Sequence, residues 1–101
     1  MGAERRKHRR VPVRIDGQWK GTSAGGLCKL ANLSMGGCFL RAPAKPAPGE
    51  SAVLTMYFDR HGPMTLEGRV VHVLPPSGFA LQFHKMTPSL LFQLGIHMEA
   101  L

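Results

Sequence analysis

The sequence lacks the features of secreted and membrane-spanning proteins. Its two cysteines, Cys28 and Cys38, are too few for the disulfide framework on which small secreted domains depend. No apolar run approaches the roughly 20 residues of a membrane-spanning helix, and no apolar segment follows the basic N-terminus as it does in a signal peptide. Gly2 starts no myristoylation signal, because Arg6 stands where Ser or Thr is expected. These absences predict a cytoplasmic protein that does not insert into a membrane.

The sequence also lacks a motif for catalysis or for metal binding. Ser34 has no histidine close to it in the sequence and no G-x-S-x-G context, which argues against a nucleophile. The two cysteines flank this serine and are expected to be buried free thiols. The histidines are scattered without H-x-x-H or cysteine–histidine spacing, which argues against a metal site; they are His8, His61, His72, His84 and His97. We therefore predict neither an enzymatic activity nor a cofactor.

Acidic and aromatic residues are scarce as well. The chain has 6 acidic residues against 13 lysines and arginines, which gives a formal net charge of +7. Such an excess of positive charge predicts an anionic partner. A small basic barrel that binds nucleic acid is therefore one alternative. The 7% aromatic content argues against it, because few side chains are left on which the bases of a single strand can stack.

What the chain does contain fits one small globular domain of 101 residues. Its 12 glycines and 8 prolines indicate frequent turns, which favours an all-β fold. Short segments with strand-like patterns follow one another along the chain and predict a small antiparallel barrel. These segments are residues 11–15, 18–23, 27–33, 38–42, 52–58, 65–74 and 79–83.

Two local expectations accompany this assignment. Asp16-Gly17 predicts a turn between the first two segments. Gly68 is expected to mark a bulge within residues 65–74.

One helix is expected, at residues 89–100. Thr87 and Pro88 have the character of an N-cap and a first helical residue. Apolar residues then recur at helical spacing, and this stripe is expected to cover an open end or face of the sheet; it comprises Leu90, Leu94 and Met98.

The positive charge is concentrated at the N-terminus, where residues 4–10 contain five basic residues and one acidic residue. Arginine offers a planar fork of donors that fits phosphate oxygens and stacks on flat rings. We predict that residues 1–10 form a flexible basic arm and that residues 11–101 form the folded domain. A solvated tail is the simpler interpretation of this arm when it is considered alone.

A second motif lies in residues 32–37, Asn-Leu-Ser-Met-Gly-Gly. Asn32 and Ser34 supply short polar side chains at a strand end, and the glycines permit positive φ and close approach of backbones. Taken alone, this segment is typical of an ordinary hairpin turn.

The two motifs together resemble those of the PilZ domain family. An R-x-x-x-R arm before the first strand is best matched by Arg6 and Arg10, and the later (D/N)-x-S-x-x-G motif is matched by Asn32, Ser34 and Gly37. Residues 66–71 and 78–83 resemble the family's late strands, and residues 89–100 its C-terminal helix, so the resemblance covers nearly the whole chain.

The resemblance implies a six-stranded antiparallel β-barrel that binds cyclic di-GMP. It implies that arginines grip the phosphates and stack on the guanines, that Asn32 and Ser34 hydrogen-bond a guanine edge or the backbone around it, and that Gly37 shapes the turn. The register of the arm is open by one residue, so both arginine pairs are included. The candidate ligand-binding residues are Arg5, Arg6, Arg9, Arg10, Asn32, Ser34, Gly36 and Gly37.

The resulting hypothesis is a stand-alone receptor or adaptor without enzymatic activity. Binding of cyclic di-GMP is expected to order the arm and so to change contact with an effector protein that the sequence does not identify. One alternative is a PilZ-like protein-interaction module that binds no nucleotide, and the presence of both motifs argues against it. The other is the nucleic-acid-binding barrel.

Overall fold

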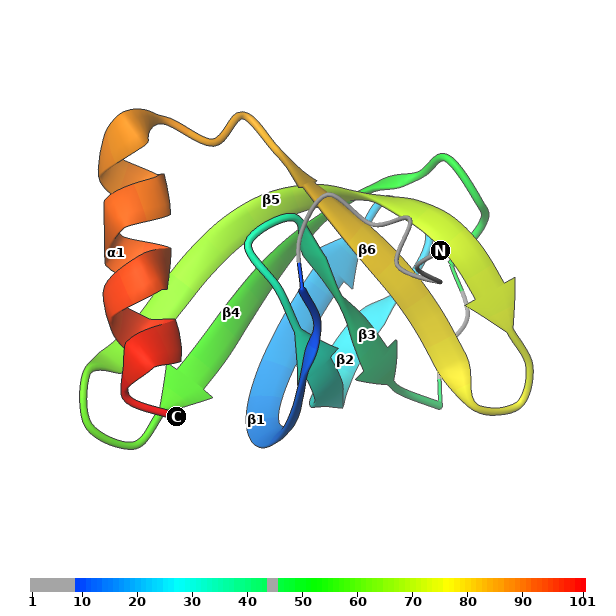
Figure 1. The fold of residues 1–101 in the computed structure, drawn as a ribbon. Helices are drawn as coiled ribbons and strands as arrows, with labels where there is room; N and C mark the ends of the chain where they lie inside the picture. The colour runs from blue at the N-terminus through cyan, green and yellow to red at the C-terminus, as the bar shows by residue number, and fades with distance from the viewer. Residues whose placement is uncertain (1–8, 44–45) are drawn as a thin grey trace, which may run out of the picture.

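The computed structural model describes residues 9–43 and 46–101, which form a six-stranded barrel and one helix (Figure 1). Every pair of neighbouring strands is antiparallel, and the barrel closes in the order β1-β2-β3-β6-β5-β4. The all-β, six-stranded antiparallel fold predicted from the sequence is confirmed. The strands are β1 (Val11–Gly21), β2 (Gly25–Leu33), β3 (Gly37–Arg41), β4 (Ser51–Phe58), β5 (Gly62–Leu74) and β6 (Gly78–His84).

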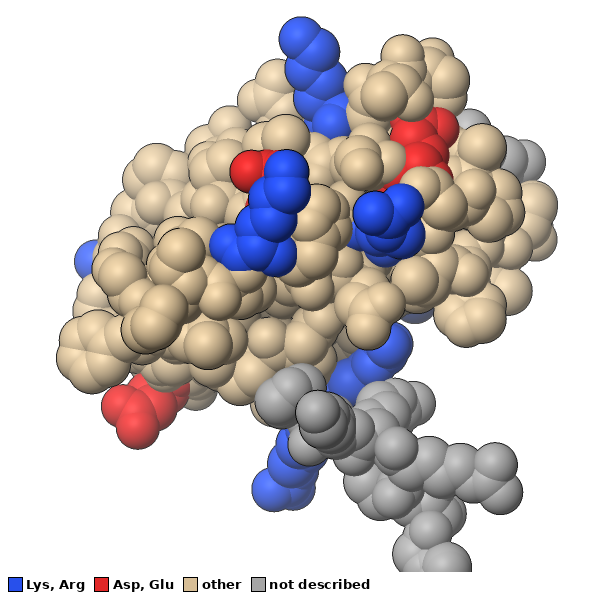
Figure 2. All heavy atoms as spheres, turned by 90° about the horizontal axis from the view of Figure 1, so that it is seen from above, with Lys and Arg blue, Asp and Glu red and all other residues tan. Residues whose placement is uncertain are grey.

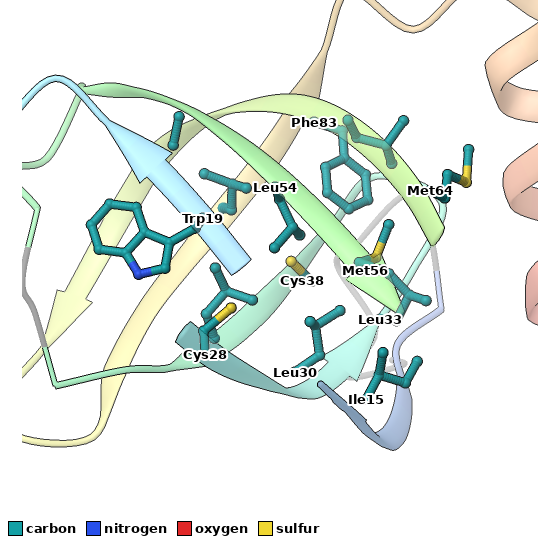
Figure 3. Close-up of a cluster of buried hydrophobic side chains, with 14 of the residues drawn as sticks. Ile15, Trp19, Cys28, Leu30, Leu33, Cys38, Leu54, Met56, Met64 and Phe83 are labelled. Atoms are coloured by element: carbon teal, nitrogen blue, oxygen red, sulfur yellow. The ribbon is translucent and has the colours of Figure 1, made fainter. Parts of the chain in front are cut away.

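The core lies inside the barrel because alternate residues of each strand point inward. In β4 every second residue is buried, from Ala52 to Phe58, as the alternation in the sequence predicted. Trp19 and Phe79 are the largest fully buried side chains, and their rings meet edge to face with centroids 4.8 Å apart. Figure 3 shows Trp19, Leu54 and their neighbours converging from several strands. Burying one such side chain stabilises the fold by about 1.5–3 kcal/mol.

The turn expected at Asp16-Gly17 is wrong, because β1 runs without a break through both residues. Gly17 pairs with Cys28 on one side and with Met56 on the other, so it lies in the middle of the sheet. A Cβ atom at this position would be 3.0 Å from the Thr55 carbonyl oxygen. Gly17 therefore serves close packing of β1 on its neighbours and not a reversal of the chain.

The bulge expected at Gly68 is also wrong. Gly68 pairs regularly with Ala52 and Phe83, and a Cβ atom there would be 2.6 Å from Leu81 Cγ. The register shift between β5 and β6 lies instead between Val70 and His72.

Two further register shifts interrupt the barrel near the start of β1. The β1–β2 ladder shifts between Pro12 and Ile15, and the β2–β3 ladder shifts between Leu30 and Asn32. Bulges of this kind bend a strand and redirect its side chains. They occur here beside the motif at residues 32–37.

Helix α1 (Pro88–Glu99) confirms the helix expected at residues 89–100. The side chain of Thr87 caps it by accepting a hydrogen bond from the backbone N–H of Leu90 at 3.1 Å, and Pro88 begins the first turn. Leu94 is fully buried against the barrel core, and the ring of His97 lies 4.4 Å from the ring of Phe58. The helix stands along one flank of the barrel (Figure 1). No helix in the described part of the chain is long and apolar enough to span a membrane.

Candidate functional site

The turn between β2 and β3 is held by the side chain of Ser34, which is only 4% exposed. Its hydroxyl oxygen accepts hydrogen bonds from the backbone N–H groups of Gly36 and Gly37, both at 3.1 Å, and donates to the Gly37 carbonyl at 3.2 Å. A hydroxyl has one proton and two lone pairs, so these three bonds use its full capacity. Ser34 fixes the shape of the turn from within.

The same turn is fastened to β6. The backbone N–H of Phe83 donates to the Gly36 carbonyl at 2.9 Å. Gly37 pairs with Gln82, and a Cβ atom at Gly37 would overlap the carbonyl oxygen of Leu81. The close backbone approach expected at Gly37 is therefore present.

The positive φ that was also considered for these glycines is not found. Among the described residues, the glycines with positive φ are Gly26, Gly49, Gly62 and Gly78. Gly37 is required because β3 and β6 come too close for a side chain, and not because its backbone is left-handed.

A hollow of about 490 Å³ lies beside the turn and brings Arg10 together with Ser34, Gly36 and Gly37. Its wall continues over the β5 bulge, along β6 and to the start of α1, through Val71, His72, Gln82, Met86 and Leu91. An arginine, the glycine backbone of the turn and apolar side chains thus surround one open space. This combination can hold an anionic group next to a flat ring.

Asn32, on β2, precedes Ser34 by two residues but does not line the hollow. It pairs with Pro12 on β1 and with Phe39 on β3. Its side-chain oxygen is buried and has no hydrogen-bond partner among the described residues. A buried acceptor without a partner costs about 1–3 kcal/mol, so a donor supplied from outside would relieve this cost.

The arginines of the arm are only partly described. Arg10 is half-buried in the hollow, whereas Arg9 is exposed and does not line it. Arg5 and Arg6 lie outside the described residues. The structure therefore brings four of the eight candidate residues into one wall, and Asn32 is not among them.

The two cysteines are buried and unpaired, as expected. Burial raises the pKa of the Cys28 thiol to about 11, and the carboxylate of Asp16 adds to this shift. Burial also raises the pKa of the Cys38 thiol; Cys28 raises it further, and the charge of Arg10 opposes the shift. Because the thiolate is the reactive form, neither residue is activated as a nucleophile.

Several residues of the hollow could not be predicted from the sequence. His72 and Gln82 are the polar ones, Met86 lies in the connection between β6 and α1, and Leu91 belongs to the first turn of α1. His72 reaches the hollow because the β5–β6 register shifts just before it, and a register shift leaves no mark in a single strand's pattern. Nothing within the sequence of β5 itself distinguishes His72 from the other outward-facing residues of that strand.

The surface charges bear on the remaining alternatives. Figure 2 shows Lys and Arg side chains in separate groups on one face of the molecule, with other residues between them. The described residues on this face form no continuous basic stripe of the kind that tracks a nucleic-acid backbone. Within residues 9–43 and 46–101, no group of three His, Cys, Asp or Glu side chains could hold a metal ion.

Comparisons with known proteins agree on one family. The family model described as "PilZ domain" matches residues 4–95. No curated protein sequence matches the chain.

Solved structures share the fold at low sequence identity. The PilZ domain with c-di-GMP of YcgR from Escherichia coli superposes with a TM-score of 0.75 at 15% identity, over 95% of this chain and 91% of that one. The PilZ domain of CeSA from a cellulose-synthesizing bacterium gives a TM-score of 0.73 at 18% identity, over 90% and 98%. The Bacillus subtilis inhibitor of motility MotI/DgrA gives 0.76 at 18% identity, over 96% of this chain and 51% of that one.

Proposed function

The chain belongs to the PilZ domain family, and from this premise we propose that it is a non-enzymatic receptor for cyclic di-GMP. The observation that carries the proposal is the meeting of Arg10 with the Ser34–Gly37 turn around one hollow. Support also comes from the solved PilZ domain of YcgR, which shares the fold and contains c-di-GMP.

The chemistry of the hollow suits such a ligand. Cyclic di-GMP has two phosphates and two guanines, and the Arg10 guanidinium can pair with a phosphate or lie flat on a base. The arm places Arg6 four residues before Arg10, and we assign it a second contact of the same kind. Arg5 and Arg9 add charge to the arm in this proposal.

Asn32 and Ser34 have different tasks in this proposal. Asn32 has a buried oxygen without a partner, and a guanine N–H is a suitable donor for it once its side chain turns toward the hollow. Ser34 has no free hydrogen-bonding capacity, so it acts by holding the turn. The shape of the turn then sets the positions of Gly36 and Gly37 in the wall of the hollow.

The output of the receptor lies in its contact with an effector protein. Ligand bound by Arg6 and Arg10 orders the N-terminal arm across the mouth of the hollow. This ordering changes the surface that an effector meets. If the chain were an interaction module that binds no nucleotide, the position of Arg10 beside the Ser34–Gly37 turn would have no function.

Calorimetry on the purified chain tests the proposal. Cyclic di-GMP is titrated at two salt concentrations, beside an unrelated oligonucleotide of equal charge. Saturable binding of cyclic di-GMP that salt weakens only moderately supports the receptor. Binding of the oligonucleotide alone, with a steep dependence on salt, would instead identify a nucleic-acid-binding protein, and no binding of either would favour the interaction module.

A further inference from the structure

Two further hollows adjoin one another away from the Ser34–Gly37 turn. The first, of about 340 Å³, lies between the first half of β1, the β4–β5 turn and the end of α1. The second, of about 520 Å³, lies over β1, β2 and the end of β3. Val13 and Arg14 line both hollows. We call the two hollows together the Arg14 surface.

The position of Arg14 follows from the bulge in β1. Two residues of β1, Val13 and Arg14, separate Pro12 from Ile15, while only one residue separates their partners on β2, Asn32 and Leu30. The extra residue redirects side chains at this point. Arg14 is exposed there and stands between the two hollows.

Positive charge prevails on the Arg14 surface. Arg14 and Arg60 line the first hollow, which holds one acidic residue, Asp59. Lys29 and Arg41 join Arg14 in the second hollow, which also holds one acidic residue. That residue, Asp16, is already paired with Lys29 at 2.8 Å.

The three arginines of this surface have no ionic partner among the described residues. Within the described residues, no carboxylate lies in ion-pair distance of Arg14, Arg41 or Arg60. Arg14 belongs to both hollows, so a single segment that crosses from one to the other meets all three guanidinium groups.

Apolar side chains accompany these charges. Val13 and Ile15 belong to the core cluster or pack on it, and they also line the first hollow. Tyr57 is 43% exposed and Leu101 is 53% exposed at the same place. Figure 1 shows the C-terminus beside the end of β4. An occupant must therefore offer both apolar side chains and negative charge.

We propose that the Arg14 surface docks an extended segment of an effector protein in which acidic and apolar residues alternate. Carboxylates of the segment pair with the three arginines, and its apolar side chains enter the first hollow. A protein segment fits better than a nucleic-acid strand, because the first hollow also offers apolar side chains such as Val13 and Ile15, which a phosphate backbone leaves without a partner. The inference rests on the proposed receptor function in one respect: it takes this surface as the place where the receptor contacts its effector. Its test needs no nucleotide.

The test measures fluorescence anisotropy of a labelled decapeptide of alternating glutamate and leucine with the full chain. A lysine–leucine decapeptide and a ten-nucleotide oligothymidylate serve as controls for charge and for nucleic acid. We expect the glutamate–leucine peptide to bind and Arg14→Glu to weaken it at least about tenfold. Lys20→Glu is the matched control, since Lys20 is an exposed residue of the same strand and lines neither hollow.

A second variant guards against a folding defect. Arg60→Glu changes a residue of the β4–β5 turn, outside the barrel ladders, and should also weaken the peptide. Melting curves establish that both variants fold. Failure of the peptide to bind, equal losses with Arg14→Glu and Lys20→Glu, or tighter binding of the oligonucleotide would each overturn the inference. Peptide binding by a chain that binds no cyclic di-GMP would support the inference and overturn the receptor function instead.

Discussion

Pro12 on β1 lies opposite Asn32 on β2, at the last rung before the ladder between these strands shifts register. Proline has no N–H to donate, and the side-chain oxygen of Asn32 likewise has no partner. The regular ladder between β1 and β2 is therefore interrupted close to the residues at which the N-terminal arm joins the barrel. Arg10, two residues before Pro12, can adjust to a ligand there without breaking a regular ladder.

The first prediction concerns this arginine. Arg10→Ala removes a charge-assisted contact of the proposed site, and such contacts contribute about 1.5–3 kcal/mol. We expect calorimetry to show cyclic di-GMP binding weakened by roughly ten- to a hundredfold, and a comparable loss for Arg6→Ala. Arg9→Ala and Arg5→Ala are the controls and should lose less, because Arg9 is exposed outside the hollow. Unchanged affinity in both Arg6→Ala and Arg10→Ala would show that the arm takes no part in binding.

The second prediction concerns Ser34. Ser34→Ala leaves the N–H groups of Gly36 and Gly37 without their partner in a buried turn, which costs about 1–3 kcal/mol of stability. We expect a lower melting temperature without ligand and a smaller loss of binding than for Arg10→Ala. A variant with the wild-type melting temperature and strongly weakened binding would show that the hydroxyl contacts the ligand directly.

The third prediction concerns Gly37. In Gly37→Ala the new methyl group overlaps the Leu81 carbonyl oxygen, so β3 and β6 must separate. We expect a clear drop in melting temperature together with weakened cyclic di-GMP binding. Gly95→Ala is the matched control, because a Cβ atom there meets nothing within 4 Å. Alanine is the better helix former by about 1 kcal/mol, so this control should be at least as stable as the wild type.

The sequence predicted correctly those strands and helix ends that are specified by a pattern within a single segment. The alternation from Ala52 to Phe58 and the cap at Thr87 depend only on near neighbours, and both expectations are confirmed. The turn predicted at Gly17 and the bulge predicted at Gly68 are wrong for one reason. A glycine in a strand can mark a turn, a bulge or a close approach of backbones, and only the register between strands distinguishes these three cases.

The candidate site shows the same limit. Spacing along the chain does not place Arg10 beside the Ser34–Gly37 turn; that expectation came from resemblance to a family. The contributions of His72 and Leu91 to the hollow depend on a register shift and on the docking of α1. Both are properties of the assembled barrel, so no pattern in a local stretch of sequence predicts them.

The fourth prediction concerns pH. Hydrogen bonds from the backbone of Ser23, the backbone of Ala47 and the side chain of Ser23 lower the pKa of Glu50 from 4.5 to about 2. A carboxylate whose pKa is lower in the folded state stabilises the fold above its unfolded pKa and loses this effect as the pH falls. We expect the wild type to lose this stability between about pH 4.5 and pH 2.

Glu50→Gln tests this assignment, because it keeps the shape of the side chain and removes its charge. The variant should be less stable than the wild type at pH 7, and the difference should shrink as the pH falls toward 2. Thermal melts at several pH values measure both effects. A difference that stays constant down to the lowest pH would contradict the role of the carboxylate.

The last prediction joins the arm to the barrel. Residues 1–10 contain only Met1 and Ala3 as apolar side chains, so they can add little to a core. Five basic residues among positions 5–10 also repel one another, and a bound phosphate would neutralise this repulsion. Deleting residues 1–10 should therefore leave the melting temperature nearly unchanged without ligand and abolish cyclic di-GMP binding.

Ligand-dependent melting separates these two effects in one experiment. In the intact chain, ligand at a hundred times its dissociation constant should add about 2.7 kcal/mol of stability by mass action. The truncated chain should gain nothing, since the arm supplies Arg6 and Arg10 together. A truncated chain that still gains stability from cyclic di-GMP would place the binding site elsewhere on the barrel.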